Sequence, residues 1–224
     1  MSEFIRYAIY FVPQMQALAD AGAAWLGWDV IEGRAVAQPD VPGIAAMTLV
    51  PRKYGLHATL KPPFLLSEGH CVGDLNAALA RFAKAQCPVM LDELRLNRLG
   101  RFLALVPVGD QKKLNALAAD CVQEFDMFRA ATSIDEISRR RATGLTAIQD
   151  AHLTRWGYPY VFNEFQFHIT LTGPLKNDQL RLTQDHLKDA LPALPAPFPI
   201  DRIALVGQQA NGFFRLIHAY TLTG

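Results

Sequence analysis

One tetrapeptide pattern, H-x-T-L, occurs twice in this chain, as HATL at residues 57–60 and as HITL at residues 168–171. The chain has 224 residues and only 6 histidines, and chance predicts about 0.04 copies of the pattern in such a composition. An accidental pair is therefore improbable. The repeat indicates two related structural units, and this limits the possible folds more than any other feature of the sequence.

The elements predicted around the two tetrapeptides occur in nearly the same order. Each motif lies on a predicted strand that is preceded by a helix and followed by a helix and a strand hairpin. The expected elements, in chain order, are a strand at 6–13, a helix at 14–26 that stops at Gly27, a loop at 31–44, the HATL strand closed by Pro62 and Pro63, a helix at 74–86, a hairpin of 89–96 and 102–108, a helix at 110–128, a helix at 133–156 opened by a capping box, the HITL strand from about 164, a helix at 177–190 and a closing hairpin of 200–206 and 213–222.

This order predicts an α+β protein with two pseudo-symmetric lobes in one bilobal domain spanning residues 1–224. Each lobe would be an antiparallel sheet with helices outside, and the two sheets would face each other across a central cleft. We expect the first-motif lobe at about 14–110 and the second-motif lobe at about 1–13 and 160–224. The helices at about 111–157 would be an insertion.

Composition limits the class of protein. Hydrophobic residues make up 50% of the chain, mean hydropathy is +0.08, and no apolar run approaches the ~20 residues of a membrane span. The first residues lack a signal-peptide cleavage site, and the three scattered cysteines suggest reduced core thiols, so we expect a cytoplasmic protein without membrane contact. A net charge of +1 argues against a protein that coats extended nucleic acid. The oligomeric state stays open.

The two motifs place the same pair of functional groups on a strand. Residues two apart on a strand point to the same face, so His57 and Thr59 share one face, and so do His168 and Thr170. The apolar neighbours point into the core. If the halves face each other, two imidazoles and two hydroxyls converge in one cleft.

Such a set suits phosphoryl chemistry. Histidine titrates near neutral pH, so one neutral ring can take a proton from water while a charged ring gives one to the leaving oxygen. The threonine hydroxyls can donate hydrogen bonds to non-bridging phosphate oxygens. We expect no metal and no other cofactor, because the remaining histidines lack the spacing of a metal site. The alternative is a pair of ordinary strand histidines.

Three residues near the first motif are candidate substrate contacts. Lys61 lies two residues after Thr59, so on an unbroken strand it points into the same cleft, where it could neutralise a phosphate. The alternative is a strand-end lysine in water. Tyr54 could line the mouth of the cleft, and Tyr10 on the first strand could reach its floor.

A second group of candidates lies in the expected insertion and just after it. Arg139, Arg140 and Arg141 fan out on a helix, so at most one or two can face a common ligand. One of them could bind a second phosphate at the far end of a phosphosugar by a bidentate contact; the alternative is a solvated helix face. One of Tyr158 and Tyr160 could stack on a base or pack on a sugar.

These residues also support a resemblance over essentially the whole chain. Two H-x-[ST]-hydrophobic motifs on related lobes resemble the 2H phosphoesterase superfamily, which includes cyclic nucleotide phosphodiesterases and RNA 2′,3′-cyclic phosphate processing enzymes. The stretches RYAIYFVP, YGLHATLKPPF and SRRR…LTRWGYPYVFNEFQFHITLTGPL are similar to a bacterial branch that is associated with phosphonate-utilisation operons.

The resemblance implies a catalytic set of His57, Thr59, His168 and Thr170, with His57 as the acid and His168 as the base. It implies a metal-independent phosphodiesterase that opens a cyclic phosphate on a small, ribose-like phosphosugar. Two alternatives stay open. One is a phosphodiesterase for RNA or nucleotide 2′,3′-cyclic phosphates, and the other is a non-catalytic module that binds phosphosugars or nucleotides.

Overall fold

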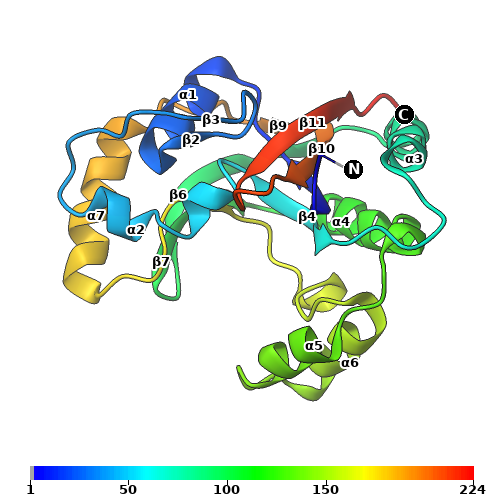
Figure 1. Cartoon of the computed structure of the whole chain (residues 1–224). Coiled ribbons are helices and arrows are strands. Elements are labelled where there is room, and N and C mark those ends of the chain that lie inside the picture. Colours follow the sequence, from blue (N-terminus) through cyan, green and yellow to red (C-terminus); the bar gives the residue numbers. More distant parts are fainter. Residues whose placement is uncertain (1–2) are drawn as a thin grey trace.

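A seven-stranded antiparallel sheet forms the centre of the protein (Figure 1). The computed structural model describes residues 3–224; residues 1 and 2, at the start of the expected second-motif lobe, lie outside the described part. The strands, in their order across the sheet, are β11 (Phe214–Thr221), β10 (Arg202–Gln208), β1 (Arg6–Phe11), β4 (Ala58–Phe64), β8 (Ile169–Thr170), β7 (Phe102–Val108) and β6 (Glu93–Leu99). Two small sheets pair β2 (Trp28–Asp29) with β3 (Arg34–Ala35) and β5 (Val89–Leu91) with β9 (Phe198–Ile200).

Helices complete the α+β fold that the sequence predicts. The α-helices are α1 (Gln16–Leu26), α2 (Ile44–Met47), α3 (Val72–Ala85), α4 (Lys112–Glu124), α5 (Ile134–Arg141), α6 (Ala147–Trp156) and α7 (Asn177–Ala190). Short 3₁₀ helices lie at η1 (Pro51–Lys53), η2 (Asp126–Phe128) and η3 (Phe162–Glu164). Figure 1 shows α5 and α6 projecting below the sheet, away from α1 and α3.

The two faces of the sheet have different partners. Along β1, Tyr7, Ile9 and Phe11 point into a large core that also takes apolar residues of α1, α3, α4 and α7. The alternating side chains Ala8 and Tyr10 point to the other face, into a small cluster around Trp28 and Phe214. Strand alternation thus separates a face packed by helices from a face that is only partly covered.

One continuous sheet takes the place of the two separate sheets that we expected. Strands β4 and β8, which bear the two motifs, are direct neighbours joined by an antiparallel pairing of Ala58 with Ile169. The motifs therefore lie side by side on one surface, instead of on two sheets that face each other across a gap.

Strand pairing also assigns the hairpins differently from the expected lobes. The first-motif strand β4 pairs with β1 and so lies with the C-terminal hairpin of β10 and β11. The second-motif strand β8 pairs with β7 of the hairpin that follows the first motif. The second motif thus pairs with a hairpin from the first half of the sequence, and the first motif lies one strand away from the hairpin of the second half, with β1 between them. Sequence order alone cannot reveal such an exchange, because the pairing is non-local.

Several local signals act as the sequence predicts. Gly27 ends α1 in a left-handed conformation (φ 79°) that a side chain would strain, and its N–H donates to Ala23. Ser133 caps α5 by accepting a hydrogen bond from the backbone N–H of Glu136. The single helix expected at 133–156 is instead two helices. The left-handed Gly144 (φ 81°) separates them, and Thr146 caps the second.

Other local expectations are wrong. Strand β4 continues through Pro62 and Pro63 instead of ending there. Its pairing with β1 slips between Lys61 and Phe64, so neither proline removes a donor that the ladder requires. The HITL strand is reduced to the two residues of β8.

The cysteines and the helices add two further facts. Cys121 is a buried core thiol as expected, whereas Cys71 and Cys87 are exposed. Among residues 3–224, no helix has both the length and the apolar character needed to cross a membrane.

Candidate active site

The pairing of β4 with β8 brings the two motifs together on one face. Ala58 and Ile169 are paired and are both fully buried in the core. The motif histidines and threonines adjoin these two residues in the chain, so they point to the opposite face.

The register makes the two imidazoles diagonal neighbours. Continued by one residue on each side, the pairing places His57 opposite Thr170 and His168 opposite Thr59. Diagonal neighbours in a regular antiparallel pair have Cα atoms about 7–8 Å apart. A phosphate group can bridge two side chains at that separation. Each ring thus has a hydroxyl from the other motif beside it.

Both imidazoles are anchored by the same local contact. Nδ1 of His57 lies 2.9 Å from the carbonyl oxygen of Gly55, and Nδ1 of His168 lies 2.8 Å from that of Gln166. A carbonyl can only accept, so each Nδ1 donates and Nε2 becomes the proton-accepting nitrogen of the neutral ring. Nε2 of His57 lies 3.3 Å from Oγ1 of Thr59.

The surroundings of the two rings differ. The ring of His57 is stacked on Tyr10 at a centroid distance of 3.9 Å, with Tyr54 on its border at 5.8 Å. Burial lowers the pKa of His57 to about 4, the Gly55 hydrogen bond opposes this, and the charge of His168 lowers it further. His168 is half-buried and tilts against Phe102 at 5.7 Å. His57 is therefore neutral at pH 7 in the ligand-free protein.

A cavity of about 430 Å³ opens beside these groups, within the size range of small-molecule sites. Three of the four motif side chains line it, and His168 adjoins it through Phe102. The lining residues are Arg6, Tyr10, Val50, Pro51, Tyr54, His57, Thr59, Pro62, Pro63, Phe102, Arg140, Tyr158, Thr170, Thr172, Gly173 and Pro174. Within the described chain, none of these is a carboxylate, so the lining favours an anion.

Lys61 does not point into this cavity, and the expectation for it is wrong. Thr59 pairs with Tyr10 and Lys61 pairs with Ile9, so Leu60 is an extra residue between two successive pairs. This β-bulge turns Lys61 to the face of Ile9, where helix α4 packs. The sequence argument assumed an unbroken strand, and the bulge removes that assumption.

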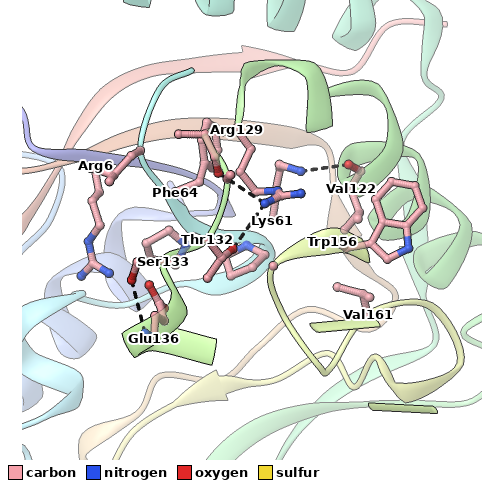
Figure 2. Close-up of a pocket in the computed structure, with 16 residues that line it drawn as sticks. Arg6, Lys61, Phe64, Val122, Arg129, Thr132, Ser133, Glu136, Trp156 and Val161 are labelled. Atoms are coloured by element: carbon pink, nitrogen blue, oxygen red, sulfur yellow. Dashed lines mark hydrogen bonds between the residues drawn. The ribbon is translucent and has the colours of Figure 1, made fainter. Parts of the chain in front are cut away.

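Lys61 instead lines a second, smaller cavity of about 120 Å³ between β4, α4 and α5, which Figure 2 shows. Its Nζ donates to the carbonyl of Val122 at 2.9 Å and lies 3.6 Å from the carboxylate of Asp126. Burial lowers the pKa of Lys61 to about 8, and Asp126 opposes that shift. The residue is 1% exposed, and these contacts hold α4 and η2 against the sheet.

Three of the four candidate tyrosines line the larger cavity. Tyr10 lies under His57, Tyr54 borders the same ring, and Tyr158 follows α6. Tyr160 does not line it; its side chain is 45% exposed and meets Tyr158 edge to face at 5.6 Å.

Of the three consecutive arginines, only Arg140 lines the cavity. Its guanidinium lies 4.8 Å from the ring centre of Tyr158 and bonds Glu136 at 2.7 Å. Arg141 lies outside the cavity and pairs with Asp150 on α6. Arg139 is exposed and lies outside the cavity. The structure thus places one residue of the run, Arg140, at the cavity.

A family model described as a protein of unknown function (DUF1045) matches residues 59–215. This chain belongs to that family. The matched segment begins at Thr59 and includes the whole second motif together with the α5–α6 hairpin.

Two curated relatives of this DUF1045 member are named ribose 1,5-bisphosphate phosphokinase PhnN. The protein from Janthinobacterium sp. (strain Marseille) is 37% identical over 220 residues, which cover 92% of this chain and 48% of the relative. The protein from Laribacter hongkongensis (strain HLHK9) is 33% identical over 224 residues, covering 95% and 50%. The chain thus spans about half the length of these relatives.

Two solved structures are similar to this DUF1045 member at 17% sequence identity. TT0787 of Thermus thermophilus matches with a TM-score of 0.42, over 98% of this chain and 99% of that one. Escherichia coli LigT in its apo form matches with a TM-score of 0.43, over the full length of both chains.

Sequence reasoning missed Arg6 and Phe102 as site residues of this DUF1045 member. Arg6 shares the strand face of Tyr10 on β1, so the same alternation argument could have found it. Phe102 begins β7, and no local signal connects it to the second motif. Thr172 also lines the cavity, but its hydroxyl accepts a hydrogen bond from the backbone N–H of Leu103. Among the described residues, no cluster of His, Cys, Asp and Glu side chains could hold a metal ion.

Proposed function

We propose that this chain is a metal-independent phosphodiesterase that opens a cyclic phosphate on a ribose-like phosphosugar by paired acid–base catalysis from His57 and His168. One observation carries the proposal. Two imidazoles, each anchored through Nδ1 to the carbonyl two residues earlier, are diagonal neighbours beside a cavity without carboxylates. A pure binding site would have no need of two such proton-transfer groups.

The chemistry follows from this arrangement. A neutral imidazole takes a proton from water through Nε2 while the water oxygen attacks phosphorus. The bond from phosphorus to the ring oxygen breaks, and the other imidazole, as the cation, gives that oxygen a proton. Thr59 and Thr170 donate hydrogen bonds to the non-bridging oxygens, and these strengthen as charge develops in the transition state. The products are a phosphate monoester and a free hydroxyl.

The roles of the two rings can be separated by experiment. The resemblance gives His57 the acid role, whereas its neutral state in the ligand-free protein favours it as the base. A general acid loses its importance when the leaving group is a weak base. We therefore expect the alanine variant of the acid, but not that of the base, to recover most activity on bis(p-nitrophenyl) phosphate. Equal losses of both variants on that ester would contradict divided roles.

The substrate class is supported by the names of the relatives and by the resemblance of the sequence. The curated relatives are named for a ribose bisphosphate, and the branch that the sequence resembles is associated with phosphonate utilisation. Both point to a small phosphosugar. These 224 residues contain no G-x-x-x-x-G-K-[ST] phosphate loop, and we do not propose the kinase activity of the relatives' name for this chain.

A panel of cyclic phosphates tests the proposal against its alternatives. It should include ribose 1,2- and 2,3-cyclic phosphates, nucleoside 2′,3′-cyclic phosphates and an RNA ending in a 2′,3′-cyclic phosphate, each with and without EDTA. We expect turnover of a sugar cyclic phosphate that survives EDTA and is lost in His57→Ala and His168→Ala. Faster turnover of the RNA or the nucleotides would favour the first alternative, and binding without turnover would favour a binding module.

A further inference from the structure

The motif cavity extends well beyond the two histidines. Its volume of about 430 Å³ far exceeds the space that one phosphate group occupies. Its lining includes two cations from separate elements, Arg6 on β1 and Arg140 on α5, and no carboxylate within the described chain. The motif histidines and threonines can hold the reacting phosphate without the two arginines. The arginines are therefore available for another part of the ligand.

Arg6 extends this face of the sheet away from the histidines. It shares a strand face with Tyr10, on which the ring of His57 is stacked. The Cα atoms of Arg6 and Tyr10 are four residues apart, which corresponds to about 13 Å along a strand. Nε of Arg6 donates to Oε1 of Gln208 at 2.7 Å, and this contact orients the guanidinium. Its Nη1 and Nη2 have no hydrogen-bond partner among residues 3–224. Such a held guanidinium with two free nitrogens suits bidentate binding of a phosphate.

Arg140 enters the same cavity from the projecting hairpin. Nε and Nη2 both bond one carboxylate oxygen of Glu136, at 3.2 and 2.7 Å, and the guanidinium is stacked over Tyr158. Nη1 has no partner in the described chain. Glu136 and Arg6 both line the adjoining smaller cavity, so α5 and β1 approach each other where the two cavities meet (Figure 2).

A buried hydroxyl supplies a second, independent sign of a ligand. The Tyr10 side chain lines the cavity and is fully buried, yet its hydroxyl has no hydrogen-bond partner among residues 3–224. Burial, and after it the neighbouring Tyr54, raise the pKa of this hydroxyl, so it stays protonated and can donate a hydrogen bond. A buried donor without a partner is destabilising unless a ligand accepts from it.

We infer that Arg6 and Arg140 form a second anion subsite, which takes a terminal phosphate monoester on the substrate while the histidines act on the cyclic diester. The inference rests on the proposed function for the identity of the reacting group. A ligand with phosphate at both ends then spans the cavity, and the Tyr10 hydroxyl donates to it between the two ends. The subsite makes a bisphosphorylated sugar the preferred substrate over a nucleoside cyclic phosphate.

Binding tests the subsite without any reaction. Ribose 5-phosphate has a terminal phosphate and no cyclic diester, and its Kd is measured by calorimetry with the full chain. We expect Arg6→Gln and Arg140→Gln each to weaken binding about 10-fold or more, the effect of losing a charge-assisted hydrogen bond. Arg139→Gln, on the same helix but outside the cavity, should change Kd less than about 2-fold. Arg6→Lys and Arg140→Lys should recover only part of the affinity, because lysine keeps the positive charge but lacks the planar pair of N–H donors that binds a phosphate in bidentate fashion.

Kinetics then test specificity. Ribose 1,2- and 2,3-cyclic phosphates are compared with the same compounds bearing a phosphate on O5. We expect kcat/KM to be about 100-fold higher with the O5 phosphate, and each glutamine variant to remove at least about 10-fold of that advantage. Arg139→Gln, which lies outside the cavity, should change the O5-phosphate advantage less than about 3-fold. Circular dichroism and Tm check that each variant is folded, and the lysine variants replace any that is not.

The outcomes separate this inference from the proposed function. Turnover without an O5-phosphate preference, unchanged in both glutamine variants, would overturn the subsite and leave the phosphodiesterase standing. Arginine-dependent binding of ribose 5-phosphate without turnover of any cyclic phosphate would support the subsite and overturn the phosphodiesterase. Ribose 5-phosphate binding that Arg139→Gln weakens as much as Arg140→Gln would show a diffuse charge effect, and it too would overturn the subsite.

Discussion

The segments that bear the two motifs differ although their tetrapeptides nearly match. The first motif opens β4, which is seven residues long, bulged, and paired with β1 and β8. The second opens β8, which is two residues long and paired with β4 and β7. Yet both histidines donate from Nδ1 to the carbonyl two residues earlier. The tetrapeptide therefore fixes the orientation of the ring, while the surrounding strands fix its environment.

The side chains that pack against the two rings differ. Both residues are half-buried, but His57 is stacked on Tyr10 and has its pKa lowered to about 4, whereas His168 packs against Phe102 at the border of the cavity. An acid and a base that work together need different pKa values, and burial moves the pKa of His57 away from the ordinary histidine value.

The largest expected effect comes from removing either ring. We expect His57→Ala and His168→Ala each to lower kcat/KM for a cyclic phosphate about 10²–10⁴-fold, because each removes one proton transfer. The double variant should lose little more than the worse single variant, since the two rings act as a unit. His186→Ala on the exposed surface of α7 is the control. Losses that multiply in the double variant would argue against a common reaction step.

The threonines should have the next largest effect. Thr59→Val and Thr170→Val keep side-chain shape and remove one donor each, and we expect kcat to fall about 10–10³-fold. The register places each threonine opposite the other motif's histidine, so the two losses should be similar in size. Thr221→Val, on the exposed edge strand β11, should have no effect. A loss confined to one threonine would break the symmetry inferred from the strand register.

The pH profile tests the difference between the two rings. A bell-shaped kcat/KM profile should have its acidic limb near pH 4, where His57 titrates in the ligand-free protein, whichever role that ring has. Tyr10→Phe keeps the stacked ring and should leave the limb in place, whereas Tyr10→Ala admits water and should move it upward toward the ordinary histidine value of about 6.5. Identical limbs in the two variants would contradict burial as the cause.

The smallest expected effect is on stability. The folded-state pKa of His57 is about 4, below the unfolded value near 6.5, so its contribution to stability is lost as pH falls through that window. Between pH 7 and pH 5 we expect the wild type to lose about 1–2 kcal/mol of unfolding free energy from this group. Urea titrations at both pH values should show that His57→Gln loses less unfolding free energy than the wild type between pH 7 and pH 5, and the difference should equal that amount. An unchanged loss would mean that the pKa of His57 is not lowered in the folded protein.

The sequence contains enough information for the local features and for the motif groups. Gly27, the Ser133 cap and the 177–190 helix follow from short-range rules, and the alternation within H-x-T-L correctly puts histidine and threonine on the face away from the core. The helical fan of the arginine run also predicts that at most one or two of the three can face the cavity, and Arg140 alone does.

What failed depends on contacts between distant residues. The exchange of hairpins and the joining of two expected sheets are set by β4–β8 pairing, which no local pattern encodes. One extra residue in the β1–β4 ladder turned Lys61 from the cavity to the helix side. A bulge leaves no consistent mark in the residue types around it, so alternation counted through it gives the wrong face.

Nuclear magnetic resonance of the histidine ring nitrogens, recorded during a titration with inorganic phosphate, tests most directly whether both imidazoles flank one phosphorus atom. We expect the Nε2 signals of His57 and His168 to shift together with a single Kd, and the pKa of His57 to rise because the bound anion favours its charged form. If phosphate binds while only one of the two rings responds, or if the two rings respond with different Kd values, the paired mechanism is contradicted.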